Sequence, residues 1–259
     1  MIDLFVADVQ RLLWRLLLRA LGLTAVVAIA VVSVANFLQN SGKQRFNVFT
    51  GLRPGFAAAT VLLALAGFSL GASSFGADCS SRALTTMLTW EPRRSRVLAA
   101  RAASCAAVTA CFSLAALALL FVALLPAALA RGNGAVPTSG WYLSLAGLGL
   151  RGVLLAAAAA AVGVSCAAIG RSTAAALATM AVYLLAVENA MTGVWLGLSR
   201  WLIVTDSLSW LAVSPQTRIS GPSGRAAGHT IVTGGLLLLA AVLALHALAT
   251  WMLTHRDVT

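Results

Sequence analysis

The chain has 259 residues, 60% of them hydrophobic and only 10% charged, with a formal net charge of +11 and a mean hydropathy of +0.93. A soluble globular domain of this size needs far more polar surface, so that class is excluded. The positive charge does not indicate a nucleic-acid partner either, because the basic residues sit at the edges of apolar runs, where lipid headgroups and the cytoplasmic surface lie.

Six apolar runs follow one another along the chain. They are continuous rather than alternating, and because backbone polar groups must be satisfied within hydrocarbon, such runs favour helices over a β-barrel. Each run is close to the ~20 residues that cross ~30 Å of hydrocarbon. The sequence therefore predicts an all-α polytopic membrane protein, with residues 1–259 forming one transmembrane domain in the lipid bilayer. The predicted spans are 19–38, 56–76, 102–125, 146–169, 173–190 and 229–253.

Residues 1–18 precede the first span and predict an amphipathic helix lying in the membrane interface. Arg11, Arg15 and Arg19 recur four residues apart on one helical face, and apolar residues occupy the others. This pattern also places Trp14 at headgroup level. A cleaved signal peptide is the alternative interpretation, and the length of the amphipathic part argues against it.

Small residues mark helix-packing faces in the second and fourth predicted spans. Residues 67–71 and 156–163 are rich in glycine and alanine, which allow close approach of helices. These faces stabilise the bundle internally or form a seam with a second copy, and the sequence leaves both open. Residues 170–172 predict a tight turn between spans four and five, although a single bent helix there would reduce the count to five.

The orientation follows from the distribution of basic residues. Six spans place both termini on one side of the membrane, and the densest basic cluster lies on that same side, between spans two and three. The positive-inside rule therefore predicts a multi-pass plasma-membrane protein with both termini in the cytoplasm. The cluster consists of Arg82, Arg93, Arg94, Arg96 and Arg101.

Two long connections remain, at 39–55 and at 191–228. The second carries tryptophans and prolines, and its apolar stretches are too short to span a membrane. Such a segment is external or re-entrant, and we expect short external helices that dip into the outer leaflet.

The connection between spans two and three, residues 77–101, predicts a short cytoplasmic helix that docks a soluble partner. Ser80 or Ser81 would cap its N-terminus, Asp78 would complement its dipole, and Pro92 would end it. An apolar stripe at helical spacing consists of Leu84, Met87 and Leu88. A solvated loop that merely obeys the positive-inside rule is the alternative.

Part of this connection, Leu88-Thr89-Trp90-Glu91-Pro92-Arg93-Arg94, resembles a motif of the permease subunits of ABC-2 type transporters, particularly those of actinobacteria. The order of elements along the whole chain is similar as well. Three departures from the family pattern are present: Asp78 stands where Glu is usual, Cys79 replaces an aromatic residue, and Arg82-Ala83 replaces Gly-Thr.

The resemblance implies a permease half of an ATP-driven exporter. This chain and a second permease chain, identical or related, would form the pathway, and two cytosolic ABC ATPase subunits carrying ATP and magnesium would drive export of a drug, lipid or other amphiphile. The implied ATPase interface consists of Asp78, Ser80, Arg82, Leu84, Met87, Leu88, Trp90, Glu91, Pro92, Arg93, Arg94 and Arg96.

The chain has no catalytic motif of its own. A phosphate-cradling GxxxxGK[ST] loop is absent, so neither ATPase activity nor a cofactor is expected in this chain. The four cysteines lack metal-ligand spacing, and we interpret them as small buried residues. We expect His246 to be a neutral core or interface residue rather than a ligand.

Glu188 is the one acidic residue within a predicted span, near the outer end of span five. An intramembrane carboxylate is costly and is therefore a functional candidate, pairing with Arg151 or Arg200 or lining the substrate pathway. The alternative is that Glu188 ends the span and is hydrated at the outer interface.

Two other functions compete with the permease interpretation. A non-transporting membrane sensor or assembly partner would have no ATPase bound to it. An intramembrane enzyme would need polar residues converging at one depth, and the acidic residues here are few and scattered.

Overall fold

The structure, a computed structural model, describes residues 2–14, 48–81, 93–131, 139–188, 190, 202–211, 219–220, 226–227 and 230–255. The helices are α1 (Ile2–Trp14), α3 (Val48–Ser80), α5 (Arg94–Arg131), α6 (Ser139–Gly170), α7 (Thr173–Val182), the π-helix η1 (Tyr183–Val187), α10 (Ile203–Leu211) and α11 (Ile231–His255). Two short strands, β1 (Ile219–Ser220) and β2 (Ala226–Ala227), pair antiparallel. The described fold is thus helical apart from this small pair.

Within the described ranges, four helices are long and apolar enough to cross a membrane, which makes the chain a multi-pass membrane protein. They are α3, α5, α6 and α11, and they contain the predicted spans 56–76, 102–125 and 146–169 and most of 229–253. The predicted span 19–38 lies outside the described residues.

The predicted span five, 173–190, is helical at every residue that the structure describes within it: α7 and η1 cover Thr173–Val187, and Glu188 and Ala190 are helical as well. Thr173–Val187 alone covers about 22 Å at roughly 1.5 Å per residue, so the full predicted length is needed to approach the ~30 Å of a hydrocarbon core. The turn before it is confirmed as a turn rather than a bend in one helix. Arg171 adopts a φ of 53°, and the side chain of Ser172 caps α7 by accepting a hydrogen bond from the backbone of Ala175.

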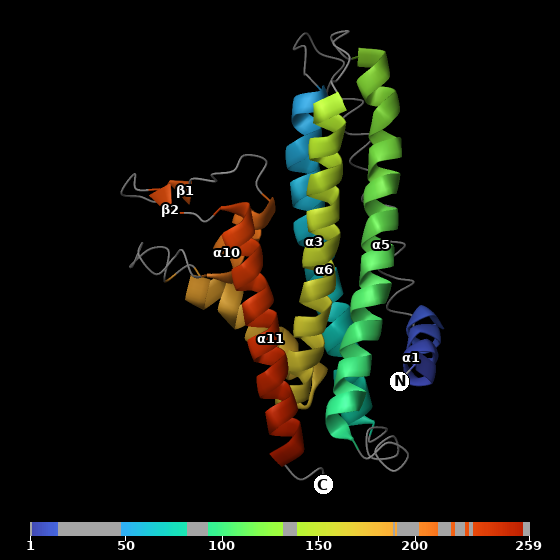
Figure 1. Cartoon of the computed structure of the whole chain (residues 1–259), viewed down its shortest axis with the longest axis vertical. Coiled ribbons are helices and arrows are strands. Elements are labelled where there is room, and N and C mark those ends of the chain that lie inside the picture. Colours follow the sequence, from blue (N-terminus) through green and yellow to red (C-terminus); the bar gives the residue numbers. More distant parts are fainter. Residues whose placement is uncertain are drawn as a thin grey trace.

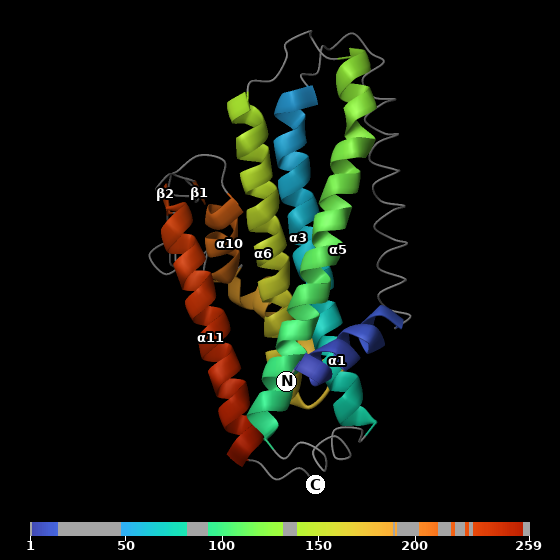
Figure 2. The same cartoon turned by 45° about the vertical axis from the view of Figure 1, so that its right-hand side comes forward.

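The core of the bundle is built by α3, α5 and α6, which stand side by side in both views (Figures 1 and 2). α11 packs against α6 on one side, and α1 lies beside one half of α5. We call the end formed by the last turn of α3, the first turns of α5 and the last turn of α11 the lower end, as drawn in Figure 1. Both α1 and the carboxyl end of α11 lie toward this lower end.

The small-residue faces of α3 and α6 pack against each other. A Cβ atom on Gly71 would overlap the carbonyl oxygen of Ala160, and one on Gly163 would overlap that of Phe68. Gly67 meets Ala156 in the same way, with only 2.7 Å between an added Cβ and the carbonyl oxygen. Of the two uses left open by the sequence, the structure therefore shows the internal one.

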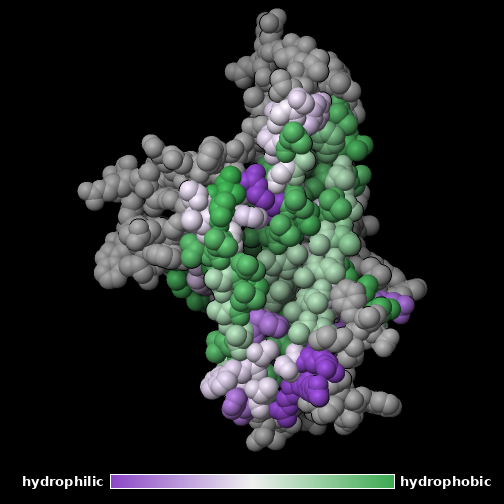
Figure 3. Space-filling model, in the orientation of Figure 1, coloured by the Kyte–Doolittle hydropathy of each residue, from purple (hydrophilic) through white to green (hydrophobic). Residues whose placement is uncertain are grey.

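The surface agrees with a membrane protein. Figure 3 shows hydrophobic side chains over much of the bundle, with the larger group of hydrophilic ones at the lower end and a smaller one in the upper half. On α11 the exposed large residues are apolar, among them Val232, Leu236, Leu239, Leu243 and Trp251. Lipid solvates such side chains without cost, so this face needs no protein cover.

Candidate functional site: a buried charge cluster at the lower end

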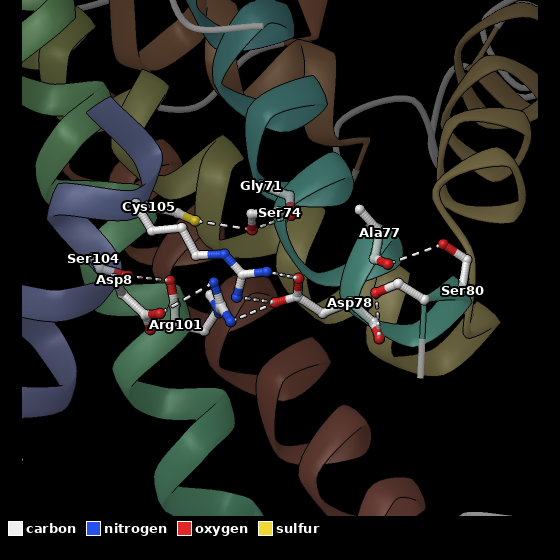
Figure 4. Close-up of polar contacts among 11 residues, drawn as sticks. Asp8, Gly71, Ser74, Ala77, Asp78, Ser80, Arg101, Ser104 and Cys105 are labelled. Atoms are coloured by element: carbon white, nitrogen blue, oxygen red, sulfur yellow. Dashed lines mark hydrogen bonds and ion pairs between the residues drawn. The ribbon is translucent and has the colours of Figure 1, made fainter. Parts of the chain in front are cut away.

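Four charged side chains from three helices meet at the lower end of the bundle. Asp8 and Arg11 come from α1, Asp78 from the last turn of α3, and Arg101 from α5, about two turns after its start. We call these four residues the charge cluster. Figure 4 shows Asp8, Asp78 and Arg101 between the three ribbons, with the end of the Arg101 side chain between the two carboxylates.

Arg101 is the central cation of the charge cluster. Its Nη2 donates a short hydrogen bond to Asp78 Oδ2, and its Nη1 lies 3.1 Å from Asp8 Oδ1. Arg11 binds the same carboxylate, with its Nη2 3.0 Å from Oδ1 and its Nη1 donating to Oδ2 at 3.4 Å. Asp78 thus receives both guanidinium groups, and the two arginines together tie α1 to both α3 and α5.

The charge cluster is buried and electrically balanced. Arg101 and Asp78 are each 1% exposed and Asp8 is 7% exposed, whereas the Arg11 side chain is 43% exposed. Removing a charge from water is expensive, and burial is tolerated because two cations meet two anions. Such a cluster holds one arrangement of helices, and removing one member takes away an ion pair that compensates a buried charge.

The sequence pattern explains how α1 comes to face the bundle. Asp8 and Arg11 are three residues apart and therefore lie on one side of the helix, next to Leu12, which is fully buried against α5. The charged side of α1 thus points inward to Asp78 and Arg101, and the position of this helix in the membrane interface stays a prediction. The side chain of Trp14 lies outside the described part of the chain.

The structure also corrects the expected roles of Asp78 and Ser80. Because α3 continues to Ser80, both residues belong to its last turn rather than to the start of a separate helix. The Ser80 hydroxyl donates back to the carbonyl of Ala77 at 2.9 Å. The Asp78 carboxylate is buried in the bundle and bound by two arginines, so it is not exposed on a helix surface.

The remaining predicted interface residues divide into two groups. Arg93 is exposed just before α5, Arg96 is half-buried in its first turn, and Arg94 donates to the carbonyl of Leu253 in α11 at 2.9 Å. This bond joins the start of α5 to the end of α11. Outside the described residues lie Arg82, Leu84, Met87, Leu88, Trp90, Glu91 and Pro92.

The predicted pathway residue Glu188 is buried rather than hydrated. It is 8% exposed, and its Oε1 accepts a 2.7 Å hydrogen bond from the backbone N–H of Val204 at the start of α10. Of its two predicted partners, Arg200 lies outside the described residues. Arg151 bonds to Trp210 at the other end of α10, with Nη1 donating to the carbonyl at 3.0 Å.

The cysteines and His246 have ordinary neighbours. Cys105 is buried and lies 3.0 Å from the Ser74 hydroxyl, Cys79 and Cys166 are half-buried, and Cys111 is exposed. His246 lies 3.3 Å from the hydroxyl of Ser165 on α6, a partner that the sequence did not indicate. Within the described residues, no group of three or more His, Cys, Asp or Glu side chains could hold a metal ion.

Sequence reasoning missed the charge cluster, because it assigned Arg101 to a basic loop and gave Asp8 no role. The available signal was the acidic residue three positions before Arg11 on a helix with apolar neighbours. No protein-family model, curated protein or solved structure matches this chain, so the argument for its function rests on its own residues and geometry. Chemically, the arginines are neutralised by carboxylates, and the cluster is suited to joining helices mechanically rather than to catalysis.

Proposed function

We propose that the chain is a permease half of an ABC-2 type exporter, coupled to a separate cytosolic ATPase and exporting a drug, lipid or other amphiphile. In this proposal residues 82–92 are the centre of the ATPase-binding segment, and the lower end of the bundle is cytoplasmic. The resemblance of residues 88–94 to the family motif motivates the proposal. The four long apolar helices supply the membrane-spanning frame, with 19–38 and 173–190 as the remaining spans.

The observation that carries the proposal is the position of the charge cluster. Residues 82–92 connect the end of α3 to the start of α5, and the cluster joins these two helices within about two turns of that connection. It also adds α1 to the pair through Asp8 and Arg11. A force applied to residues 82–92 therefore acts on α1, α3 and α5 as one packed unit.

A further contact extends this unit toward α11. The bond from Arg94 to the carbonyl of Leu253 places the end of α11 beside the first turn of α5. Under the proposal, ATP binding and hydrolysis on the partner subunits would move the lower ends of these helices together. The chain itself would hold no nucleotide.

We expect a P-loop ATPase to co-purify with this chain in near-stoichiometric amount from native membranes in mild detergent. Reversing the charges at Glu91 and Arg93, as Glu91→Arg and Arg93→Glu, should reduce the recovered ATPase at least about tenfold, because charge complementarity guides such interfaces. Quantitative mass spectrometry of the purified complex measures this ratio.

The matched control is Lys43→Glu, a charge reversal in the predicted external connection, which should leave the ATPase yield unchanged. Recovery of the folded wild-type chain without any ATPase would contradict the proposal and favour the sensor or assembly partner. A second permease chain in the same sample would be either this chain or a related one.

A further inference from the structure

The short helix α10 is held at both ends by side chains from other elements. At its start, the N–H of Ile203 donates to the Tyr183 hydroxyl at 3.0 Å, and the N–H of Val204 donates to Glu188 at 2.7 Å. At its end, Arg151 donates to the carbonyl of Trp210 at 3.0 Å. The Trp210 indole N–H returns a bond to the carbonyl of Arg151 at 3.1 Å. A carboxylate thus faces the positive end of the helix dipole and a guanidinium faces the negative end.

The π-helix η1 places Tyr183 and Glu188 together. In an α-helix, residues five apart point in directions that differ by roughly 140° around the axis. Here the N–H of Glu188 bonds to the carbonyl of Tyr183, the five-residue spacing of a π-turn, which brings the two side chains to the same face. Both can then reach adjacent N–H groups of α10. The irregular turn is therefore what makes a two-point contact possible.

The side of α10 rests in a glycine notch on α11. A Cβ atom on Gly235 would overlap the indole ring of Trp210, and one on Gly234 would lie 3.0 Å from the carbonyl oxygen of Asp206. The notch lies one turn from the start of α11, away from the lower end (Figures 1 and 2). α10 is thus seated against α11 and α6 near one edge of the apolar region.

The contact between α10 and the helices around it is polar, and one of its hydrogen-bonding groups is unsatisfied. The hydroxyl of Ser209 is fully buried and, within the described part of the chain, has no hydrogen-bond partner. Burying a hydroxyl without a partner costs stability, and hydration on leaving the seat would recover that cost. The seated position therefore depends strongly on the bonds that hold the two ends of α10.

We propose that α10 is a detachable segment, and that Tyr183 and Glu188 form a clamp that keeps it seated between α6 and α11. Release of the clamp uncovers the notch on α11 and the face of α6 around Arg151. Glu188 holds α10 in place by accepting a hydrogen bond from its backbone. The proposal concerns one conformational step and holds whether or not an ATPase drives the chain.

The test measures thiol labelling of the full chain in native membranes. Ser209→Cys is introduced after Cys79, Cys111 and Cys166 are replaced by alanine, and the buried Cys105 is kept as an internal reference. The clamp is then weakened by Glu188→Ala or by Tyr183→Phe, which removes only the accepting hydroxyl. Labelling rates with a small maleimide are followed at both cysteines by mass spectrometry.

Each clamp variant should raise the labelling rate of the cysteine at position 209 at least about tenfold, while Cys105 stays unreactive. Glu188→Gln keeps an accepting oxygen and should give a smaller rise. Tyr142→Phe, the same change at an exposed tyrosine of α6, should leave both rates unchanged. Unchanged rates at position 209 in both clamp variants would overturn the proposal. An equal rise at Cys105 would overturn it too, because it would show loosening of the whole bundle.

Discussion

Replacing Arg101 by methionine should lower the free energy of unfolding by about 3–5 kcal/mol, because it removes the buried guanidinium that binds the buried carboxylates of both Asp8 and Asp78. For a chain of this size that corresponds to a fall in Tm of roughly 10 °C. The loss can be followed in mild detergent through labelling of Cys105, which is fully buried in the folded chain, with Cys79, Cys111 and Cys166 replaced by alanine.

Two further variants separate charge from packing in this experiment. Adding Asp8→Asn to Arg101→Met restores neutrality, with Asp78 still bound by Arg11, and should recover a large part of the lost stability. Arg11→Met removes a partly exposed cation and should cost only about 0–1 kcal/mol. If Arg101→Met and Arg11→Met proved equally mild, the charge cluster would not hold the helices as argued.

A leucine at position 163 should disrupt the bundle at the seam between α3 and α6. The obstacle to a side chain at Gly163 is the backbone carbonyl of Phe68, which cannot rotate away as a flexible side chain would. Overpacking costs about 1–3 kcal/mol in ordinary cores, and we expect the upper end of that range or more here. The expected result in detergent is loss of the monodisperse folded species.

Gly149 offers a matched control on the same helix. A Cβ atom there meets nothing within 4 Å, so Gly149→Leu should leave the size-exclusion profile and Tm close to those of the wild type. Equal behaviour of the two leucine variants would contradict close packing at Gly163. The comparison uses one substitution type and one helix, so differences in helix propensity cancel.

The sequence was sufficient to locate most of the long helices, because an apolar run of about 20 residues has few alternatives to a membrane span. It was less informative about helix ends. α5 extends from Arg94 to Arg131, well beyond the predicted 102–125, since polar residues at a membrane edge end the apolar run without ending the helix. For the same reason Asp78 and Ser80 were assigned to the start of a separate short helix, although they belong to α3.

Contacts between residues that lie far apart in the sequence were the main feature that the sequence analysis did not predict. The small faces of 67–71 and 156–163 were recognised from composition, but their mutual packing depends on which helices are neighbours. The pairing of Asp8 with Arg101 joins α1 to α5 across more than ninety positions, and no local pattern encodes it. Glu188 was singled out correctly as unusual, yet its binding to α10 requires a π-turn that propensities do not reveal.

The charge cluster and the clamp on α10 lie in different parts of the molecule. The cluster joins α1, α3 and α5 at the lower end, beside residues 82–92, whereas the clamp joins η1 to α10 near the start of α11. α6 contacts α3, α5, α10 and α11 and therefore connects the two regions. In a transporter driven from one side, this arrangement would allow movement at the lower end to change how α10 is seated.

The most direct test of the proposed function is site-specific photocrosslinking in the native host. A benzophenone amino acid at Leu84 or Leu88 should form an adduct with a P-loop ATPase, whereas the same group at Leu143, exposed on α6 far from the lower end, should not. Adducts confined to the first two positions would support docking of an ATPase on residues 82–92. A folded chain that yields no ATPase adduct at Leu84 and Leu88, or equal adducts at Leu143, would contradict the permease account.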